Sequence, residues 1–457
     1  MIRFSYIYRM KNILVAVSLL LVQFTSAQYW QPVGGGTNAV VSGFATYNGL
    51  LYVSGDFSKA GNTPASFIAT WNGTKWDSVG GGIKPDSGGL GGAYPFVSYD
   101  SILYVAGQFS KAGNDSVRSI AQWNGTSWDS LGSGITNKFG WVVYSIAEYN
   151  GELYGGGNFI AYKSGIEEIV RWNGIKWDSV GHGTDDEVNA FTVYNNILYV
   201  GGYFLHAGGH NANYIASWDG TKWDSVGTGM NDLVLALAVY NNKLYAAGSF
   251  TTAGGSPANN IAVWNDTVWA PLGKGVNGGV RDMKVFNNKL YVAGLFDSAG
   301  GKPASEVASW DGVKWSNVGA GLTGGVVGLG VYDSSLYAGG WFTRSGKDTV
   351  NYIARWNDTL TGINEISNKV NNIKVFPNPS SNGKFTIEIT NYELRIAGQK
   401  DEIEVYNMMG ENIYNTHFIQ TQNVNQIDLS GQPDGIYLYR IISNNGELIA
   451  TGKLIIQ

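Results

Sequence analysis

Tryptophans recur in pairs along this chain, and the second partner of each pair lies five residues after the first. The fullest form of the motif is W-N-G-T-x-W, and the six pairs are Trp71/Trp76, Trp123/Trp128, Trp172/Trp177, Trp218/Trp223, Trp264/Trp269 and Trp310/Trp315. A seventh first partner, Trp356, has no second partner after it, whereas Trp30 in YWQPVGGG aligns with Trp76 in KWDSVGGG. Because the missing half of the last repeat stands near the start of the sequence, we expect seven repeats that close into a ring.

Each repeat contains four short runs that are typical of β-strands. In residues 233–272 these runs are LVLALAVY, LYAAGSF, IAVW and VWAPLG. Asn241-Asn242 between the first two runs, and Asn72-Gly73 between the last two runs of another repeat, suit primed hairpin turns, which need positive φ at both central residues. Four antiparallel strands repeated at this period are typical of a β-propeller blade. We therefore expect an all-β chain with a seven-bladed β-propeller, in which the N-terminal strand around Trp30 closes the last blade.

The composition excludes several classes of protein. Charged residues make up 14% of the chain and the net charge is −5, so the sequence offers no clustered basic face for a nucleic acid. The chain has no cysteine, which excludes disulfides, thiolate nucleophiles and sulfur-ligated zinc. Large aromatic side chains suit packing between blades, so the paired tryptophans are expected in the core and not in a sugar platform. We predict no cofactor and a monomer.

The first 27 residues read as a secretory signal peptide. Lys11 precedes the apolar run 13–22, and small residues stand before a cleavage point between Ala27 and Gln28. The apolar run is too short to span a bilayer, and no other segment approaches a membrane span. We expect a mature protein without a transmembrane segment.

After Trp356 the repeat stops. We therefore divide the rest of the chain into a propeller at 28–360, a polar linker at 361–372 and a second module at 373–457. The strand-like runs of this module, such as GKFTIEIT and GIYLYRIIS, are bounded by turn residues and predict a small β-sandwich.

This second module resembles the C-terminal sorting domain of the bacterial type IX secretion system. The resemblance is carried by VFPNP at 375–379, VYNMMGE at 405–411, DGIYLYRI at 434–441 and the terminal KLIIQ. The motif residues are Pro377, Asn378, Pro379, Gly410, Gly435 and Tyr437. The resemblance implies export through the type IX machinery of a Gram-negative cell, with the protein released or attached to the outer cell surface.

The propeller repeat resembles those of kelch and galactose-oxidase-type proteins. A Gly doublet ends the second strand, as at Gly201-Gly202 and Gly339-Gly340, and a Trp follows further on. The repeat departs from kelch by carrying Ile-Ala, for example from Ile68, where a kelch blade usually has Tyr. Copper-radical chemistry of the galactose-oxidase kind needs a cysteine cross-linked to tyrosine, and this chain has none.

One position varies from repeat to repeat while its neighbours do not. It lies between the Gly and the Phe that end the second strand, and the seven residues are Asp56, Gln108, Asn158, Tyr203, Ser249, Leu295 and Trp341. The same place in every blade should form a ring near the central channel, and this mixture of groups suits a sugar or a peptide. The alternative is variation of a solvated rim without function, because loops also vary without selection for binding.

Other groups in the loops are weaker candidates. His206 and His210 with a nearby acid, or Asp185 to Glu187 with calcium, would be metal sites, but chance loop residues explain both. We assign no metal site and no catalytic residue. Three functions remain open: a surface module that binds glycans or proteins, a polysaccharide lyase or glycoside hydrolase using residues such as Asp56, Tyr203 or Glu168, and a structural adhesion protein.

Overall fold

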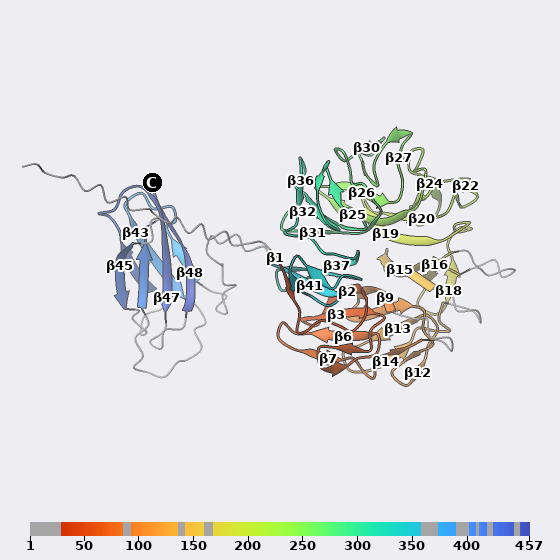
Figure 1. Ribbon diagram of the computed structural model, residues 1–457, viewed down its shortest axis with the longest axis horizontal. Coiled ribbons are helices and arrows are strands. Elements are labelled where there is room, and N and C mark those ends of the chain that lie inside the picture. The colour runs from red at the N-terminus through yellow and green to blue at the C-terminus, as the bar shows by residue number, and fades with distance from the viewer. Residues whose placement is uncertain are drawn as a thin grey trace, which may run out of the picture. The chain divides into compact units, whose positions relative to one another are not determined.

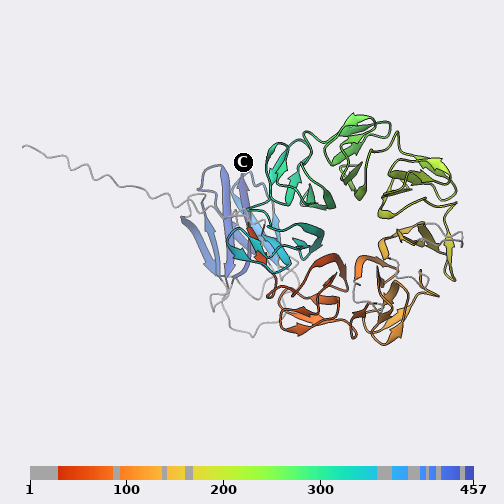
Figure 2. The same cartoon turned by 45° about the vertical axis from the view of Figure 1, so that its right-hand side comes forward.

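Seven four-stranded antiparallel sheets are found among the described residues between 29 and 357, and Figures 1 and 2 show them set around a common centre. The computed structural model describes residues 29–85, 93–135, 142–159, 168–357, 373–389, 402–407, 411–417, 424–442 and 448–457. The chain divides into two compact units, of which one is Ala27–Asp358 and the other contains the sorting module. The predicted signal peptide 1–27 with Ala27, and also Gln28, the linker 361–372 and Gly410, lie outside the described residues.

In six of these sheets the four strands follow one another in the sequence. Sheet 1 holds β2 (Val41–Tyr47), β3 (Leu50–Gly55), β6 (Ile68–Trp71) and β7 (Trp76–Ser78). Sheet 2 holds β9 (Ala93–Tyr99), β10 (Ile102–Gly107), β13 (Ile120–Trp123) and β14 (Trp128–Ser130). Sheet 3 holds β15 (Val142–Tyr149), β16 (Glu152–Asn158), β17 (Ile169–Trp172) and β18 (Trp177–Ser179). Sheet 4 holds β19 (Val188–Tyr194), β20 (Ile197–Gly202), β23 (Ile215–Trp218) and β24 (Trp223–Ser225). Sheet 5 holds β25 (Val234–Tyr240), β26 (Lys243–Gly248), β29 (Ile261–Trp264) and β30 (Trp269–Pro271). Sheet 6 holds β31 (Val280–Phe286), β32 (Lys289–Gly294), β35 (Val307–Trp310) and β36 (Trp315–Asn317).

Sheet 7 joins the two ends of the repeat region. Its strands are β37 (Val326–Tyr332), β38 (Ser335–Gly340), β41 (Ile353–Asn357) and β1 (Tyr29–Pro32). Trp30 pairs with Trp356 in antiparallel register, as the alignment of the repeats predicts. The indole rings of this pair lie 5.3 Å apart between centroids, and Trp30 is fully buried. A strand from the start of the repeat region therefore completes the sheet built from its end.

Among the described residues, ribbons formed by pairs of two-residue strands lie between the second and third strands of six sheets, and one further short strand, β8, follows sheet 1 and pairs with β11. These strands are β4 (Lys59–Ala60), β5 (Thr63–Pro64), β8 (Ile83–Lys84), β11 (Lys111–Ala112), β12 (Asp115–Ser116), β21 (His206–Ala207), β22 (His210–Asn211), β27 (Thr252–Ala253), β28 (Ser256–Pro257), β33 (Ser298–Ala299), β34 (Lys302–Pro303), β39 (Arg344–Ser345) and β40 (Asp348–Thr349).

Each tryptophan pair links two strands of one sheet and then reaches the sheet before it. Trp71 faces Trp76 across the third and fourth strands of sheet 1, with ring centroids 5.0 Å apart. The Trp76 indole N–H donates to the Val33 carbonyl oxygen at 3.1 Å, and Trp30 does the same to Val318 at 3.3 Å. The second tryptophan of every sheet makes this bond to the sheet before it. The paired tryptophans are thus core and inter-sheet ties, as expected.

A tyrosine at the end of six of the seven innermost strands ties the sheets in the other direction. The Tyr47 hydroxyl donates to the Ser101 carbonyl oxygen of sheet 2 at 2.8 Å, and Tyr332 of sheet 7 donates to Gly49 of sheet 1 at 3.1 Å. Sheet 6 has Phe286 at this position, so this bond is missing between sheets 6 and 7.

The two hairpin turns of a repeat differ in conformation. Asn241 and Asn242 have φ of 47° and 53°, as the primed turn predicts. The prediction of a primed turn at Asn72-Gly73 is wrong, because of these two residues only Gly73 has positive φ. Here the Asn72 carboxamide oxygen instead accepts the backbone N–H groups of Thr74 and Lys75, which caps a four-residue loop.

The second unit contains two antiparallel sheets in its described residues. One sheet is formed by β42 (Ile373–Phe376), β43 (Lys384–Ile389) and β46 (Val424–Asp428), and the other by β44 (Glu402–Tyr406), β45 (Asn412–His417), β47 (Gly435–Ile442) and β48 (Leu448–Ile456). Buried side chains of both sheets, including Phe385, Val405 and Ile441, share one core.

Candidate functional site

The seven variable residues occupy equivalent places at one end of the sheets. Each directly precedes a buried phenylalanine, from Phe57 in sheet 1 to Phe342 in sheet 7. The Trp341 backbone N–H donates to the Gly325 carbonyl oxygen at 3.0 Å, and the same bond fixes Asp56, Tyr203, Ser249 and Leu295 to the residue before the innermost strand of their own sheets. Asp56, Tyr203, Ser249, Leu295 and Trp341 are exposed, whereas Gln108 and Asn158 are partly buried.

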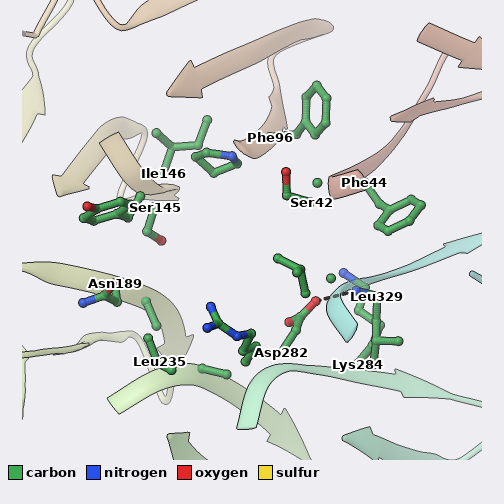
Figure 3. A pocket seen from close by; sticks show the side chains of 18 of the residues that line it. Ser42, Phe44, Phe96, Ser145, Ile146, Asn189, Leu235, Asp282, Lys284 and Leu329 are labelled. Carbon is green, nitrogen blue, oxygen red and sulfur yellow. Dashed lines mark hydrogen bonds between the residues drawn. The ribbon is translucent and has the colours of Figure 1, made fainter. Parts of the chain in front are cut away.

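A cavity of about 540 Å³ lies between the innermost strands of all seven sheets (Figure 3). Two of the seven predicted residues, Asp56 and Trp341, line it. The other five, which the structure also describes, lie outside its wall. The predicted ring is therefore placed at equivalent positions, but most of it does not reach the cavity.

The cavity wall is made mainly by residues that sequence reasoning missed. At the start of the innermost strands the register shifts, for example between Val280 and Asp282, so one extra residue is left without a partner in the ladder. These bulged residues all line the cavity, and they are Ser42, Tyr144, Asn189, Leu235, Arg281 and Val327. These six residues occupy the same position of the repeat, the one that Arg281 holds two residues after Gly279. The residue type at this position differs in every one of these repeats, as it does at the position of Asp56 and Trp341.

Sheet 6 brings an unusual set of charges to this wall. Its innermost strand β31 reads VRDMKVF, and Arg281, Asp282 and Lys284 all line the cavity. The equivalents of Asp282 in the other sheets are small or proline, from Gly43 in sheet 1 to Gly328 in sheet 7. Three charged residues in one innermost strand, where the other six hold at most one, are the sequence signal that marks this site.

The Asp282 carboxylate accepts hydrogen bonds from two backbone N–H groups. Its two oxygens accept the N–H groups of Met283 and, from the next sheet, of Leu329, both at 2.7 Å (Figure 3). Burial raises the pKa of the Asp282 carboxyl, while the nearby Lys284 ammonium lowers it. Asp282 thus caps a free N–H on the innermost strand of sheet 7 and ties two sheets together.

Arg281 and Trp341 form the most structured part of the cavity mouth. The Arg281 guanidinium lies over the Trp341 ring, 4.9 Å from its centroid. Arg281 is exposed to the channel, yet the surrounding walls desolvate its guanidinium and lower its pKa. In the described part of the chain Arg281 has no ion-pair partner.

Gly325 allows the Trp341 ring to lie where it does. It has φ of +90°, and an added Cβ would come within 2.8 Å of Leu295 Cδ2 and 3.1 Å of Trp341 Cε3. Leu295 and Trp341, both about half exposed, therefore flank the same glycine. Together they form an apolar platform beside the cavity.

Three polar atoms near the channel are buried without a hydrogen-bond partner among the described residues. They are Ser42 Oγ, Asn189 Nδ2 and Asn158 Oδ1. Ser42 and Asn189 line the cavity (Figure 3), whereas Asn158 donates through its Nδ2 to Glu187 Oε1 at 2.6 Å. Buried polar atoms normally have a partner, and the Ser42 and Asn189 atoms are closed off from the cavity in their present rotamers, so each side chain must turn before it can bind a polar group there.

Glu168 is another buried carboxyl of the propeller unit with a raised pKa. The Glu168 side chain is buried, and burial raises the pKa of its carboxyl to about 7. The hydrogen bond that it accepts from the Phe159 N–H lowers this pKa, whereas the nearby Asp186 and Glu187 raise it. Glu168 does not line the cavity.

The loop histidines lie beside an acid but have no metal-like cluster. Asp185 Oδ2 lies 2.7 Å from His206 Nδ1, and Asp185 Oδ1 accepts the N–H groups of Leu205 and His206. In the ranges that the structure describes, no group of three or more His, Cys, Asp or Glu side chains is placed to hold a metal ion.

The described motif residues of the second unit gather beside its last strand. Asn378 donates to the Lys453 carbonyl oxygen at 2.8 Å and accepts the Ile455 N–H at 2.9 Å, between Pro377 and Pro379. Gly435 pairs with Ile456, and the buried Tyr437 donates to the Pro433 carbonyl oxygen at 2.6 Å. The motif therefore folds onto the terminal strand β48.

Comparisons with known proteins agree with the architecture of both units. Residues 374–457 match the family "Secretion system C-terminal sorting domain", and residues 241–262 match the family "Domain of unknown function (DUF5122) beta-propeller". None of the curated proteins matches the chain. No helix in the described residues is long and apolar enough to cross a membrane.

Three solved structures align with the chain at low identity and with TM-scores below 0.5. The extracellular domain of a protein assigned to a one component system in B. thetaiotaomicron has a TM-score of 0.46 at 11% identity over 94% of this chain, which spans 58% of that domain. The β-propeller domain of the Trilobed protease from Pyrococcus furiosus has a TM-score of 0.40 at 12% identity, covering 70% of this chain and 96% of that one. A family 32 glycoside hydrolase from Bifidobacterium adolescentis has a TM-score of 0.27 at 10% identity, covering 94% and 77%. The chain thus combines a β-propeller with a sorting domain, which implies export through the type IX secretion system to the cell surface or the extracellular space.

Proposed function

We propose that this chain is an exported, non-catalytic binding module whose ligand, a glycan in preference to a protein, enters the cavity between the innermost strands. In this proposal residues 28–360 are one kelch-like, seven-bladed propeller, and residues 373–457 are a β-sandwich that serves as the sorting domain after the signal peptide 1–27 and the linker 361–372. The seven sheets and the Trp30–Trp356 pairing support the first part. The two sheets with a common core support the second.

The observation that carries the binding role is the cavity wall. It joins a half-exposed tryptophan to buried polar atoms that lack partners, at Ser42 and Asn189. An aromatic face together with a few convergent polar groups is typical of ligand sites. A glycan supplies both an apolar ring face and many hydroxyls.

The test is retention of the purified full chain on an array of defined glycans, with mass spectrometry of each spot. We expect retention without product masses, and we expect Trp341→Ala and Asn189→Ala each to reduce it at least about tenfold, the loss of roughly 1.4 kcal/mol. Val313→Ala, at an 84% exposed position in the hairpin turn of sheet 6, is the matched control and should bind like the parent. Equal binding by all three variants would contradict a site in the cavity, and absence of retention would favour a structural adhesion role.

A second candidate is a polysaccharide-active enzyme, because two carboxylates, Asp56 and Asp282, line the cavity. Burial raises the pKa of both carboxyls, which suits acid–base chemistry. Against it, both Asp282 oxygens already accept backbone N–H groups. Product masses on the array that disappear in Asp56→Asn would make this candidate the better one.

A further inference from the structure

The cavity contains a cation that the protein does not neutralise. Four charged residues line the wall, namely Asp56, Arg281, Asp282 and Lys284. Asp282 is engaged by two backbone N–H groups and lies close enough to Lys284 for the two charges to interact. Arg281 has neither a carboxylate partner nor full hydration in the described structure. A partly desolvated guanidinium without a counter-ion is costly unless an anion joins it.

The contact with Trp341 holds the guanidinium in a defined position. The Arg281 guanidinium carbon lies 4.9 Å from the Trp341 ring centroid, a contact that attracts the cation to the ring face, and the N–H groups lie in the guanidinium plane. The edge of this plane matches the two oxygens of a planar carboxylate through parallel hydrogen bonds. The geometry therefore favours a carboxylate over a bulky neutral group at this place.

The rest of the bulged-residue ring fits the remainder of a sugar. Ser42 and Asn189 line the cavity at the same repeat position as Arg281, and after a rotamer change the unpartnered Oγ and Nδ2 suit ring hydroxyls. Leu235 and Val327 flank Arg281 in the neighbouring sheets at that position and suit the C–H face of a pyranose ring. A volume of about 540 Å³ lies within the usual range for small-molecule sites.

We infer that the cavity binds acidic glycans through the carboxylate of a hexuronic acid, which pairs with Arg281, while Ser42 and Asn189 bind its hydroxyls. The inference rests on the proposed glycan-binding function and names the class of glycan. The chain carries a net charge of −5, so it does not attract polyanions in general. Binding of an acidic glycan would instead depend on the two local cations, Arg281 and Lys284.

The experiment is isothermal titration of the full chain with a galacturonic acid trisaccharide and with its methyl ester, which is neutral and nearly isosteric. We expect the acid to bind at least about tenfold more tightly than the ester. Arg281→Met should remove that difference. Arg281→Lys should keep part of it, because lysine retains the positive charge but lacks the planar pair of N–H groups that binds both carboxylate oxygens. Lys302→Met, on the exposed ribbon strand β34 of the same repeat, changes the net charge equally and should bind like the parent.

The outcomes separate this inference from the proposed function. Equal affinity for acid and ester would overturn the acidic-glycan inference and leave glycan binding in place. Tighter, Arg281-dependent binding of a sulfated trisaccharide would replace the carboxylate by sulfate as the ligand group. Arg281-dependent binding of a glutamate tripeptide without binding of either saccharide would overturn both, as would failure of every saccharide to bind. Because acid and ester are compared on the parent protein, the main result does not depend on whether a variant folds.

Discussion

At the scale of single residues, Glu168 shows how burial couples this fold to pH. Its side chain is 7% exposed and its pKa is raised from 4.5 to about 7, mainly by burial. A raised pKa in the folded state means that the protonated form is favoured by folding. The stability that Glu168 contributes is therefore complete below about pH 4.5 and is lost as the pH rises through about 7.

Glu168→Gln should remove this dependence. The amide keeps an oxygen for the Phe159 N–H and carries no charge, so the variant should match the parent near pH 4.5 and exceed its free energy of unfolding by about 3 kcal/mol near pH 8, at 1.36 kcal/mol per pKa unit. Urea denaturation between pH 4.5 and 8 measures it. Asp348→Asn, at an exposed ribbon position, is the control and should leave the pH profile unchanged. Parallel profiles of parent and Glu168→Gln would show that Glu168 stays hydrated.

At the scale of the elements, the repeat pattern predicted the strands better than it predicted which side chains face the channel. The pairing of Trp30 with Trp356 could be predicted because each repeat contains its own copy of the motif. The exposure of Arg281 could not be predicted. The register shift beside Val280 turns Arg281 toward the channel, and the alternation of residues along a strand does not by itself reveal a bulge. The Asn72 loop failed for a related reason: Asn-Gly suits both a primed turn and a side-chain-capped loop, because both leave positive φ to the glycine.

The tyrosine ties between sheets give a prediction for the one position that lacks a hydroxyl. Phe286→Tyr should donate a hydrogen bond to the Ser334 carbonyl oxygen of sheet 7, by analogy with Tyr240 and Asn288, whose atoms lie 2.9 Å apart. One such bond contributes about 1 kcal/mol net. Chemical denaturation should show this gain, and Tyr240→Phe should lose a similar amount. If the two variants both leave the unfolding midpoint unchanged, these bonds do not stabilise the ring.

At the scale of the whole molecule, the first and last sheets of the propeller unit share one buried cluster. Val33, Val41 and Leu51 pack there with Tyr337 and Ile353. The Trp76 indole of sheet 1 also donates to Val33, which directly follows β1. The N-terminal segment is thus held by sheet 7 through its strand and by sheet 1 through a hydrogen bond.

Deleting residues 28–36 should open the ring. The deletion removes the fully buried Trp30 and leaves β41 with an unpaired edge, which is a template for association with another chain. Size-exclusion chromatography with light scattering should show aggregates, and the thermal midpoint should fall. Deletion of residues 254–256, at the ribbon formed by β27 and β28 of another repeat, is the control for loss of a short surface segment. A monomer of the 28–36 deletion with the parent's thermal midpoint would rule out the closing role of β1.

The pairing of Trp30 with Trp356 also sets a time order for biogenesis. Residues this far apart in the sequence cannot meet until β41 has been synthesised, and the sorting domain, from residue 374, follows soon after. A chain truncated before β41 would lack both the strand that pairs with β1 and the sorting domain. Because the sorting domain follows β41 in the sequence, any truncated product that still carries the sorting domain also contains the strand that pairs with β1.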